Sequence, residues 1–124
     1  MYGGIICNNH SVTDAGGVMV WGGGAMNIDG GTIRDNTADE AGGGIRTNSY
    51  KFIISGNSVI ENNTAVKGGG VYYGSSSNTM TISESARISD NTATGNGGGI
   101  YFDSEGTLVM NGGSITGNTS TGDG

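Results

Sequence analysis

Proline is absent from this chain of 124 residues, and cysteine occurs only once. Without proline, collagen-like and polyproline segments are excluded, so the 27 glycines must meet recurring backbone requirements of another kind. Cys7 cannot form a disulfide within the chain, and Cys7 with the nearby His10 falls far short of a zinc site. We therefore expect no metal and no cofactor, and we interpret Cys7 as a free thiol.

Basic residues and long apolar runs are also scarce. Five lysines and arginines stand against eleven aspartates and glutamates, and the formal net charge of -6 repels phosphate backbones and anionic lipids. No segment approaches the roughly 20 apolar residues that a membrane-spanning helix requires. We expect neither a nucleic-acid partner nor a membrane-spanning chain.

The most informative feature that is present is a repeat marked by asparagine. Asparagine recurs at intervals of 27, 27, 28 and 27 residues, at Asn9, Asn36, Asn63, Asn91 and Asn118. Three positions before each asparagine stands an isoleucine, at Ile6, Ile33, Ile60, Ile88 and Ile115. A second apolar column follows glycines, at Val18, Ile45, Val71 and Ile100, and a third lies at Ile28, Ile54, Ile82 and Met110. The pattern predicts three short strands in each repeat.

Repeats with so few apolar residues cannot bury a face alone, so each must stack on its neighbours. Strands stacked in register from successive turns are parallel, which predicts an all-β parallel β-helix of about 4.5 coils over residues 1–124 as one segment. Both ends would expose unpaired strand edges. We expect either a piece of a longer solenoid or end-to-end self-association.

The asparagine column has a clear physical role in such a helix. An amide at the same corner of every coil can hydrogen-bond to the amides above and below it, because it carries two donors and an acceptor oxygen. The threonine and small residues that follow, as in Thr37-Ala38 and Thr64-Ala65, are interpreted as a close bend. The glycine triplets mark a second corner that needs positive φ or close approach of the backbone.

These elements carry a family resemblance. With Asn36-Thr37-Ala38 followed by Gly42-Gly43-Gly44-Ile45, and the same spacing from Asn91 to Ile100, the chain resembles right-handed parallel β-helix repeat proteins of the polymorphic outer-membrane protein type. The counterpart of that family's FxxN element reads I-x-x-N here, and glycine usually replaces the alanine of its GGA element. The resemblance implies a right-handed, pectate-lyase-like superfold and an adhesin-like role at the bacterial cell surface or in secreted form.

Candidate ligand contacts lie in an outward column one residue after the second apolar column. Tyr72 and Tyr101 are expected to stack on neighbouring coils and face solvent, with Arg46 below them. Exposed rings suit a carbohydrate or a host or bacterial surface protein, although an aromatic ladder can also simply strengthen a sheet. The segments between the second and third columns vary most, which is typical of binding loops and of tolerated spacers: residues 20–26, 47–52, 73–80 and 102–109.

A second column holds Asp35, Asn62 and Asp90, with Glu61 beside it. Polysaccharide lyases of related fold place calcium-binding acids and a basic residue on such a face, and basic side chains are available at Arg34, Lys67 and Arg87. Asp35 and Asp90 would be two coils apart, about 10 Å, with an amide between them. Solvated surface carboxylates are the favoured interpretation, with no catalytic residue.

We therefore predict a non-enzymatic structural or adhesive β-helix segment that is extracellular or at the cell surface. The first alternative is the scaffold of a polysaccharide-active lyase or hydrolase. The second is a self-assembling fibre protein, and Cys7 on an outward column could then form an intermolecular disulfide.

Overall fold

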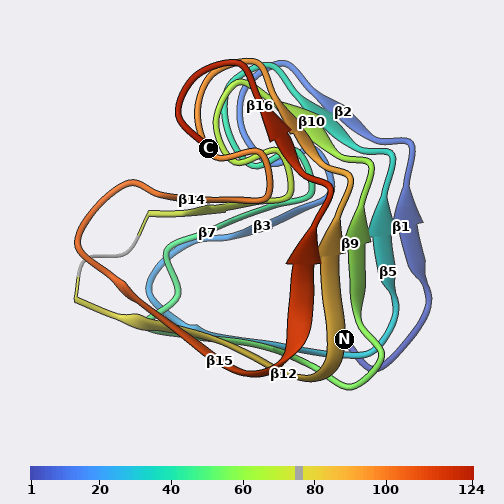
Figure 1. Ribbon diagram of the computed structural model, residues 1–124, viewed down its shortest axis with the longest axis vertical. Helices are drawn as coiled ribbons and strands as arrows, with labels where there is room; N and C mark the ends of the chain where they lie inside the picture. Colours follow the sequence, from blue (N-terminus) through green and yellow to red (C-terminus); the bar gives the residue numbers. More distant parts are fainter. Residues whose placement is uncertain (75–76) are drawn as a thin grey trace.

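The computed structural model describes residues 1–74 and 77–124 and contains no helix in that part of the chain. Successive turns of the chain lie over one another around a single axis (Figure 1). The paired strands of the described residues are parallel, and corresponding repeat positions lie opposite one another on successive turns, as Ile6 does opposite Ile33. The fold is a right-handed parallel β-helix of about 4 turns, which confirms the predicted fold class.

Three sheets form the walls of the helix. Sheet A has seven strands: β1 (Ile5–Cys7), β4 (Ala25–Asp29), β5 (Thr32–Arg34), β8 (Lys51–Ser55), β9 (Val59–Glu61), β12 (Thr79–Ser89) and β15 (Thr107–Thr116). Sheet B has five: β2 (His10–Ser11), β6 (Thr37–Ala38), β10 (Thr64–Ala65), β13 (Thr92–Ala93) and β16 (Thr119–Ser120). Sheet C has four: β3 (Val18–Val20), β7 (Ile45–Thr47), β11 (Val71–Tyr73) and β14 (Ile100–Phe102).

The distribution of strands among the sheets differs from the sequence-based assignment. The first and third apolar columns belong to one sheet, because β12 and β15 run through both, with a register shift between Glu84 and Arg87. The third wall is sheet B, which is made by the threonine-alanine pairs interpreted as a bend. A two-residue strand is too short to show periodicity in a sequence, so only the stacking of turns reveals it.

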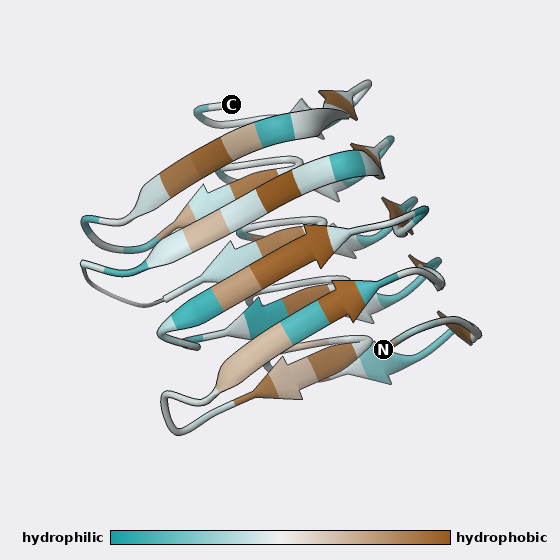
Figure 2. Ribbon diagram, turned by 90° about the horizontal axis from the view of Figure 1, so that it is seen from below, coloured by the Kyte–Doolittle hydropathy of each residue, from teal (hydrophilic) through white to brown (hydrophobic). Residues whose placement is uncertain are grey.

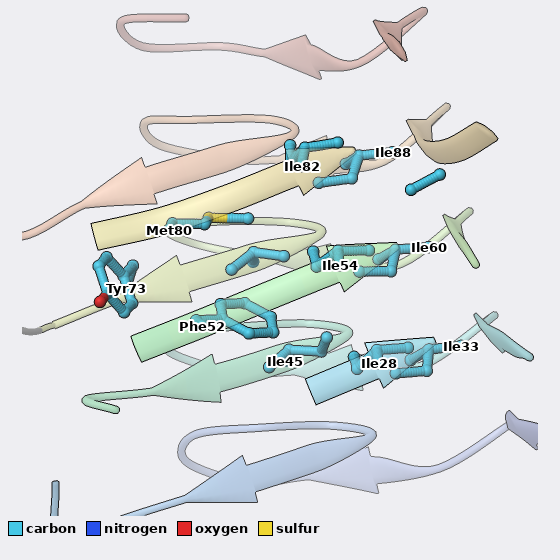
Figure 3. Packing of buried hydrophobic residues seen from close by; sticks show 12 residues of the cluster. Ile28, Ile33, Ile45, Phe52, Ile54, Ile60, Tyr73, Met80, Ile82 and Ile88 are labelled. Carbon is cyan, nitrogen blue, oxygen red and sulfur yellow. The ribbon is translucent and has the colours of Figure 1, made fainter. Parts of the chain in front are cut away.

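The core lies between the sheets and consists of the predicted inward columns. Ile28, Ile54 and Ile82 lie beside Ile33, Ile60 and Ile88 in the interior (Figure 3). Phe52, Met80 and Tyr73 fill the wider end, each fully buried. Burial of each such side chain stabilises the fold by about 1.5–3 kcal/mol. The third column is less buried on the last turn, where Met110 is 45% exposed.

The asparagine ladder is continuous and confirms the prediction. In the first four asparagines, Nδ2 donates to the Oδ1 of the asparagine on the next turn, at 2.9 Å from Asn9 to Asn36, 3.0 Å from Asn36 to Asn63 and 2.9 Å for the two remaining steps. From Asn36 onward, Nδ2 also donates to a backbone carbonyl of the preceding turn, as to Ile33 from Asn63 at 3.0 Å. The buried amides are thus fully paired, which buried polar groups require.

The glycine triplets pack directly on this ladder. A Cβ on Gly44 would lie 2.7 Å from the carbonyl oxygen of Gly70 and 2.9 Å from Nδ2 of Asn63. The first glycine of each triplet has a positive φ, 70° at Gly42 and 62° at Gly68. Both predicted reasons for glycine, close approach and positive φ, therefore hold at this corner.

Candidate functional site

The outward face of sheet C carries the predicted ligand column. Met19, Arg46, Tyr72 and Tyr101 are opposite one another on β3, β7, β11 and β14. Their chain neighbours point inward, as shown by the full burial of Val71 and Tyr73, so alternation along the strands directs this column outward. Seen from the side, the turns that present it are stacked at regular spacing (Figure 2). A rigid sheet thus positions the column.

Arg46 is the centre of this column. Its guanidinium carbon lies 4.9 Å from the ring centroid of Trp21 and 4.9 Å from that of Tyr72, so it contacts two aromatic rings. Nη1 of Arg46 also makes an ion pair of 2.8 Å with Asp14, and both side chains are mostly buried. These contacts fix the orientation of the guanidinium.

Tyr72 and Tyr101 stack as predicted, with ring centroids 5.4 Å apart and planes inclined by 27°. The prediction that both face solvent is wrong for Tyr72, which is only 7% exposed. Its ring is enclosed by Arg46 and Tyr101, and its hydroxyl hydrogen-bonds to Asp103. Burial and then the Asp103 carboxylate raise the pKa of Tyr72 from 10.0 to about 12. Tyr72 is therefore a structural member of the face.

Two other side chains supply the accessible part of the face. Trp21 is 65% exposed, and Nζ of Lys67 lies 5.5 Å above the half-buried ring of Tyr101. Trp21 lies in the variable segment 20–26, but the sequence interpretation did not single it out. Trp21 could have been found from the sequence, because it is the only tryptophan of the chain and lies in a variable loop segment. We call Trp21, Arg46, Lys67, Tyr72 and Tyr101 the aromatic-cation face.

Two hollows flank the aromatic-cation face. One, of about 310 Å³, lies toward sheet B and has carboxylates of Asp14, Asp39 and Glu40 in its wall. The other, of about 290 Å³, lies toward the variable loops and is lined in part by Trp21 and Asp103. Such volumes are near the lower end of small-molecule sites.

The variable loops contribute unevenly to these hollows. Segments 20–26 and 47–52 supply Trp21 and Asn48, and segment 102–109 supplies Asp103. Of segment 73–80, Gly74 lines the same hollow, while residues 75 and 76 lie outside the described part of the chain. Loops from different turns thus converge at the second hollow.

The acidic column has a backbone explanation. Asp35, Asn62 and Asp90 have φ values of 55°, 54° and 56°, and Asn8 and Gly117 continue the same left-handed column. Aspartate, asparagine and glycine are the residues that adopt this conformation most readily. Arg34 pairs with Asp35, while Arg87 pairs with Glu61 at 2.8 Å. The third basic candidate, Lys67, lies instead on the aromatic-cation face.

Comparison with known proteins identifies one family. The model described as "Periplasmic copper-binding protein (NosD)" matches residues 2–123. Comparison with curated proteins and with solved structures gives no match. The match confirms a β-helix repeat protein, while the polymorphic outer-membrane type stays a prediction. In the described residues, no helix is long and apolar enough to cross a membrane.

The side chains present do not fit a copper ion. Thiolate, thioether and imidazole are the preferred copper ligands. The Sγ of Cys7 accepts a hydrogen bond from Asn8 at 3.3 Å, and Nε2 of His10 lies 2.7 Å from Asp39. Met1 and Met26 line one hollow on the first turns, but Cys7 and His10 do not. Across residues 1–74 and 77–124, no group of three or more His, Cys, Asp or Glu could hold a metal.

Right-handed coils, the continuous ladder and a family match over nearly the whole length agree with one another. The side chains of this chain do not form the copper site that the family's description suggests, but its architecture agrees with the family match. The chain belongs to the family described as periplasmic copper-binding protein (NosD).

Proposed function

We propose that this chain is a non-enzymatic structural segment that presents an adhesive surface, the aromatic-cation face, to a carbohydrate or a host or bacterial surface protein. The observation that carries the proposal is the arrangement of Arg46 between Trp21 and Tyr72. It places Arg46 and Tyr72 on a sheet whose geometry is set by the core and the ladder, and the open indole ring of Trp21 follows directly after β3. Sites on such rigid elements hold their contacts without a large ordering cost.

The composition of the face supports a binding role. Tryptophan, tyrosine and arginine are the residues most enriched at the centres of binding surfaces. Aromatic rings add contact area at low entropic cost, and arginine adds directional donors. The family description supports an envelope location in the periplasm, and presentation at the cell surface or in secreted form is part of this proposal.

The acidic residues support a non-enzymatic role. Glu61 and Asp35 are engaged in ion pairs with arginines, and Asp90 holds a left-handed backbone position. A polysaccharide lyase or hydrolase would need carboxylates that converge on one reacting group. The alternative of an enzyme scaffold is tested together with binding.

The test measures binding of the purified chain to immobilised bacterial envelope polysaccharides and host surface glycoproteins. We expect saturable binding that the double variant Trp21→Ala, Tyr101→Ala reduces at least about tenfold, since two ring contacts are lost. Tyr50→Ala is the matched control, because Tyr50 is an aromatic residue with 57% exposure that lines neither hollow. Equal binding by all three proteins, or no binding to any surface, would overturn the adhesive role.

The same polysaccharides serve as substrates in a parallel assay. We expect no release of reducing or unsaturated sugars by the parent chain. Product formation that disappears in Asp35→Ala or Asp90→Ala would replace the non-enzymatic proposal with the enzyme alternative.

A further inference from the structure

The hollow of about 290 Å³ between Trp21 and Asp103 has features that define a ligand class. We propose that it binds a single ring of a neutral sugar. This inference rests on the proposed function, because it assigns a ligand to one part of the adhesive surface. Three independent observations carry it: an open aromatic platform, two unpaired buried polar atoms and the sign of the surrounding charge.

The platform is the indole of Trp21. With 65% of the residue exposed, much of the ring is open to a ligand. The guanidinium of Arg46 lies 4.9 Å from the ring centroid and restrains the indole orientation. The negative face of an aromatic ring attracts the partly positive C–H groups that line one face of a pyranose. Trp21 therefore offers a flat surface that matches the flat face of a sugar ring.

The two polar atoms are Nε of Arg46 and Oδ1 of Asn48. Both are buried, and neither makes a hydrogen bond within the described chain. Both residues line this hollow. Buried polar atoms without a partner are rare in folded proteins, since each costs about 1–3 kcal/mol. In the proposed site, a bound ligand supplies the missing partner.

The pair defines what that ligand carries. Nε of Arg46 is only a donor and Oδ1 of Asn48 is only an acceptor, so the ligand must accept at one point and donate at another. A hydroxyl group does both, and adjacent hydroxyls on a sugar ring provide several such groups on one rigid frame. An apolar ligand would leave both atoms unpaired. An ammonium group, which only donates, could not serve Arg46.

The charges around the hollow select against acidic sugars. The positive charge of Arg46 is balanced by Asp14 at 2.8 Å. Asp103, in the wall of the hollow, hydrogen-bonds to Tyr72 and adds a negative charge. The whole chain carries a formal charge of -6. A uronate or a sugar phosphate would meet like charge, whereas a neutral hexopyranose would not.

The experiment uses the intrinsic fluorescence of the chain, because Trp21 is its only tryptophan and lies in the hollow itself. The folded chain is titrated with glucose, galactose and mannose and with a linear tetrasaccharide of each, and in parallel with glucuronate and inorganic phosphate. We expect a saturable change with at least one neutral sugar, and affinity at least about tenfold lower for the two anions.

Two variants locate the binding. Asn48→Ala removes the unpaired acceptor Oδ1 and is expected to lower the affinity for the sugar that gives a fluorescence change at least about tenfold. Tyr50→Ala is expected to leave the affinity for that sugar unchanged. Because Trp21→Ala has no tryptophan fluorescence, its sugar binding is measured by ligand-observed saturation-transfer nuclear magnetic resonance. We expect the saturation-transfer signal of the sugar to be lost in this variant. Circular dichroism of each variant confirms that the β-helix is retained. If Asn48→Ala does not fold, Asn48→Asp, which keeps an acceptor and adds charge, is expected to retain neutral-sugar binding.

Several results would overturn the inference. The first is the absence of any fluorescence change with every neutral sugar up to about 50 mM, a concentration that would detect affinities much weaker than millimolar. The second is an affinity for glucuronate equal to that for the neutral sugars. The third is an Asn48→Ala variant that binds the sugar as tightly as the parent chain does. If envelope binding still depends on Trp21 and Tyr101 while the sugar titrations are flat, the adhesive surface stands and the single-sugar site is rejected. If neither envelope binding that depends on Trp21 and Tyr101 nor a response to any neutral sugar is observed, the proposed function is rejected as well.

Discussion

Two regions of each coil follow opposite rules. At the asparagine corner, which we define as the turn between sheets A and B that carries the ladder, the same residue type stands in all five turns. On the loop side, which comprises the segments between sheets C and A, every turn differs. The difference shows that the repeated residues are those that make the same contact with the next turn in every coil, whereas the segments between sheets C and A carry a different contact, or none, in each coil.

The contacts explain this contrast. At the asparagine corner each amide pairs with atoms of the turns on both sides, as Asn63 does with Asn36 and Asn91. On the loop side, an added Cβ on Gly22, Gly23 or Gly24 would meet nothing within 4 Å. A change at the first corner therefore disturbs three turns, while a side chain added at Gly22, Gly23 or Gly24 meets no neighbouring turn.

Replacement of Asn63 is expected to cause the largest loss. Asn63→Leu leaves the amide groups of Asn36 and the carbonyl of Ile33 without a partner in the fully buried middle of the ladder. We expect the free energy of unfolding to fall by about 4 kcal/mol, since each unpaired buried group costs about 1–3 kcal/mol. Urea denaturation followed by circular dichroism measures this loss.

Asn118→Leu is the matched variant on the last turn. Asn118 makes comparable hydrogen bonds but is half-buried, so water can replace part of what is lost. We expect about half the effect of Asn63→Leu. Equal losses of unfolding free energy and of melting temperature in the two variants would contradict the ladder as the source of stability.

A methyl group added at the glycine column is expected to be the next most harmful change. In Gly70→Ala the new Cβ would lie 2.6 Å from the carbonyl oxygen of Gly99 and 2.9 Å from Nδ2 of Asn91. Because backbone of the next turn cannot move away freely, we expect a loss of about 1–3 kcal/mol. Gly24→Ala on the loop side should change stability by less than about 0.5 kcal/mol. Comparable thermal shifts for both would undermine the contrast between the positions that contact the next turn and the loop side.

The left-handed column predicts an intermediate effect that is independent of side-chain contacts. Asn62 has φ 54° and is exposed. Asn62→Val forces a β-branched residue into that conformation and should cost about 1–2 kcal/mol, whereas Asn62→Gly should be neutral or slightly stabilising. Chemical denaturation compares the two. If valine and glycine behave alike, the column is not kept for its backbone conformation.

Tyr72→Phe is expected to have the smallest effect, about 1 kcal/mol for the lost hydroxyl bond to Asp103. The effect depends on pH. Because burial raises the pKa of Tyr72 from 10.0 to about 12, the folded state keeps a proton that the unfolded state releases. The stabilisation is complete below about pH 10 and is lost as the pH rises toward 12. The difference in unfolding free energy between parent and variant should therefore narrow from pH 8 to pH 11, and a constant difference would exclude this linkage.

Much of the fold could be read from residues at fixed intervals. The five asparagines predicted the ladder, and the isoleucine columns predicted the buried strands. The glycine triplets predicted close backbone approach because no other residue lacks a Cβ. Sheet B escaped prediction, since a pair such as Thr64-Ala65 is too short to carry a period.

The candidate site was predictable only in part. The sequence predicted the column with Arg46, Tyr72 and Tyr101 and the variable segment that contains Trp21. It did not predict which side chain is exposed, because Tyr72 was expected to face solvent and Trp21 was not singled out. Tyr72 is covered by Arg46 of the turn below and Tyr101 of the turn above, while Trp21 remains open. Contacts between turns decide such burial, and they involve residues more than 25 positions apart.

The interval between identical residues by itself determined that this chain coils, how long each coil is and which side chains point inward, because stacking in register repeats the same neighbours at every turn. The place of the proposed ligand site, in contrast, depends on contacts between turns that no interval in the sequence shows. The hollow beside Trp21 arises from loops of different turns, and the unpaired atoms of Arg46 and Asn48 become significant only when the surrounding chain has excluded water from them.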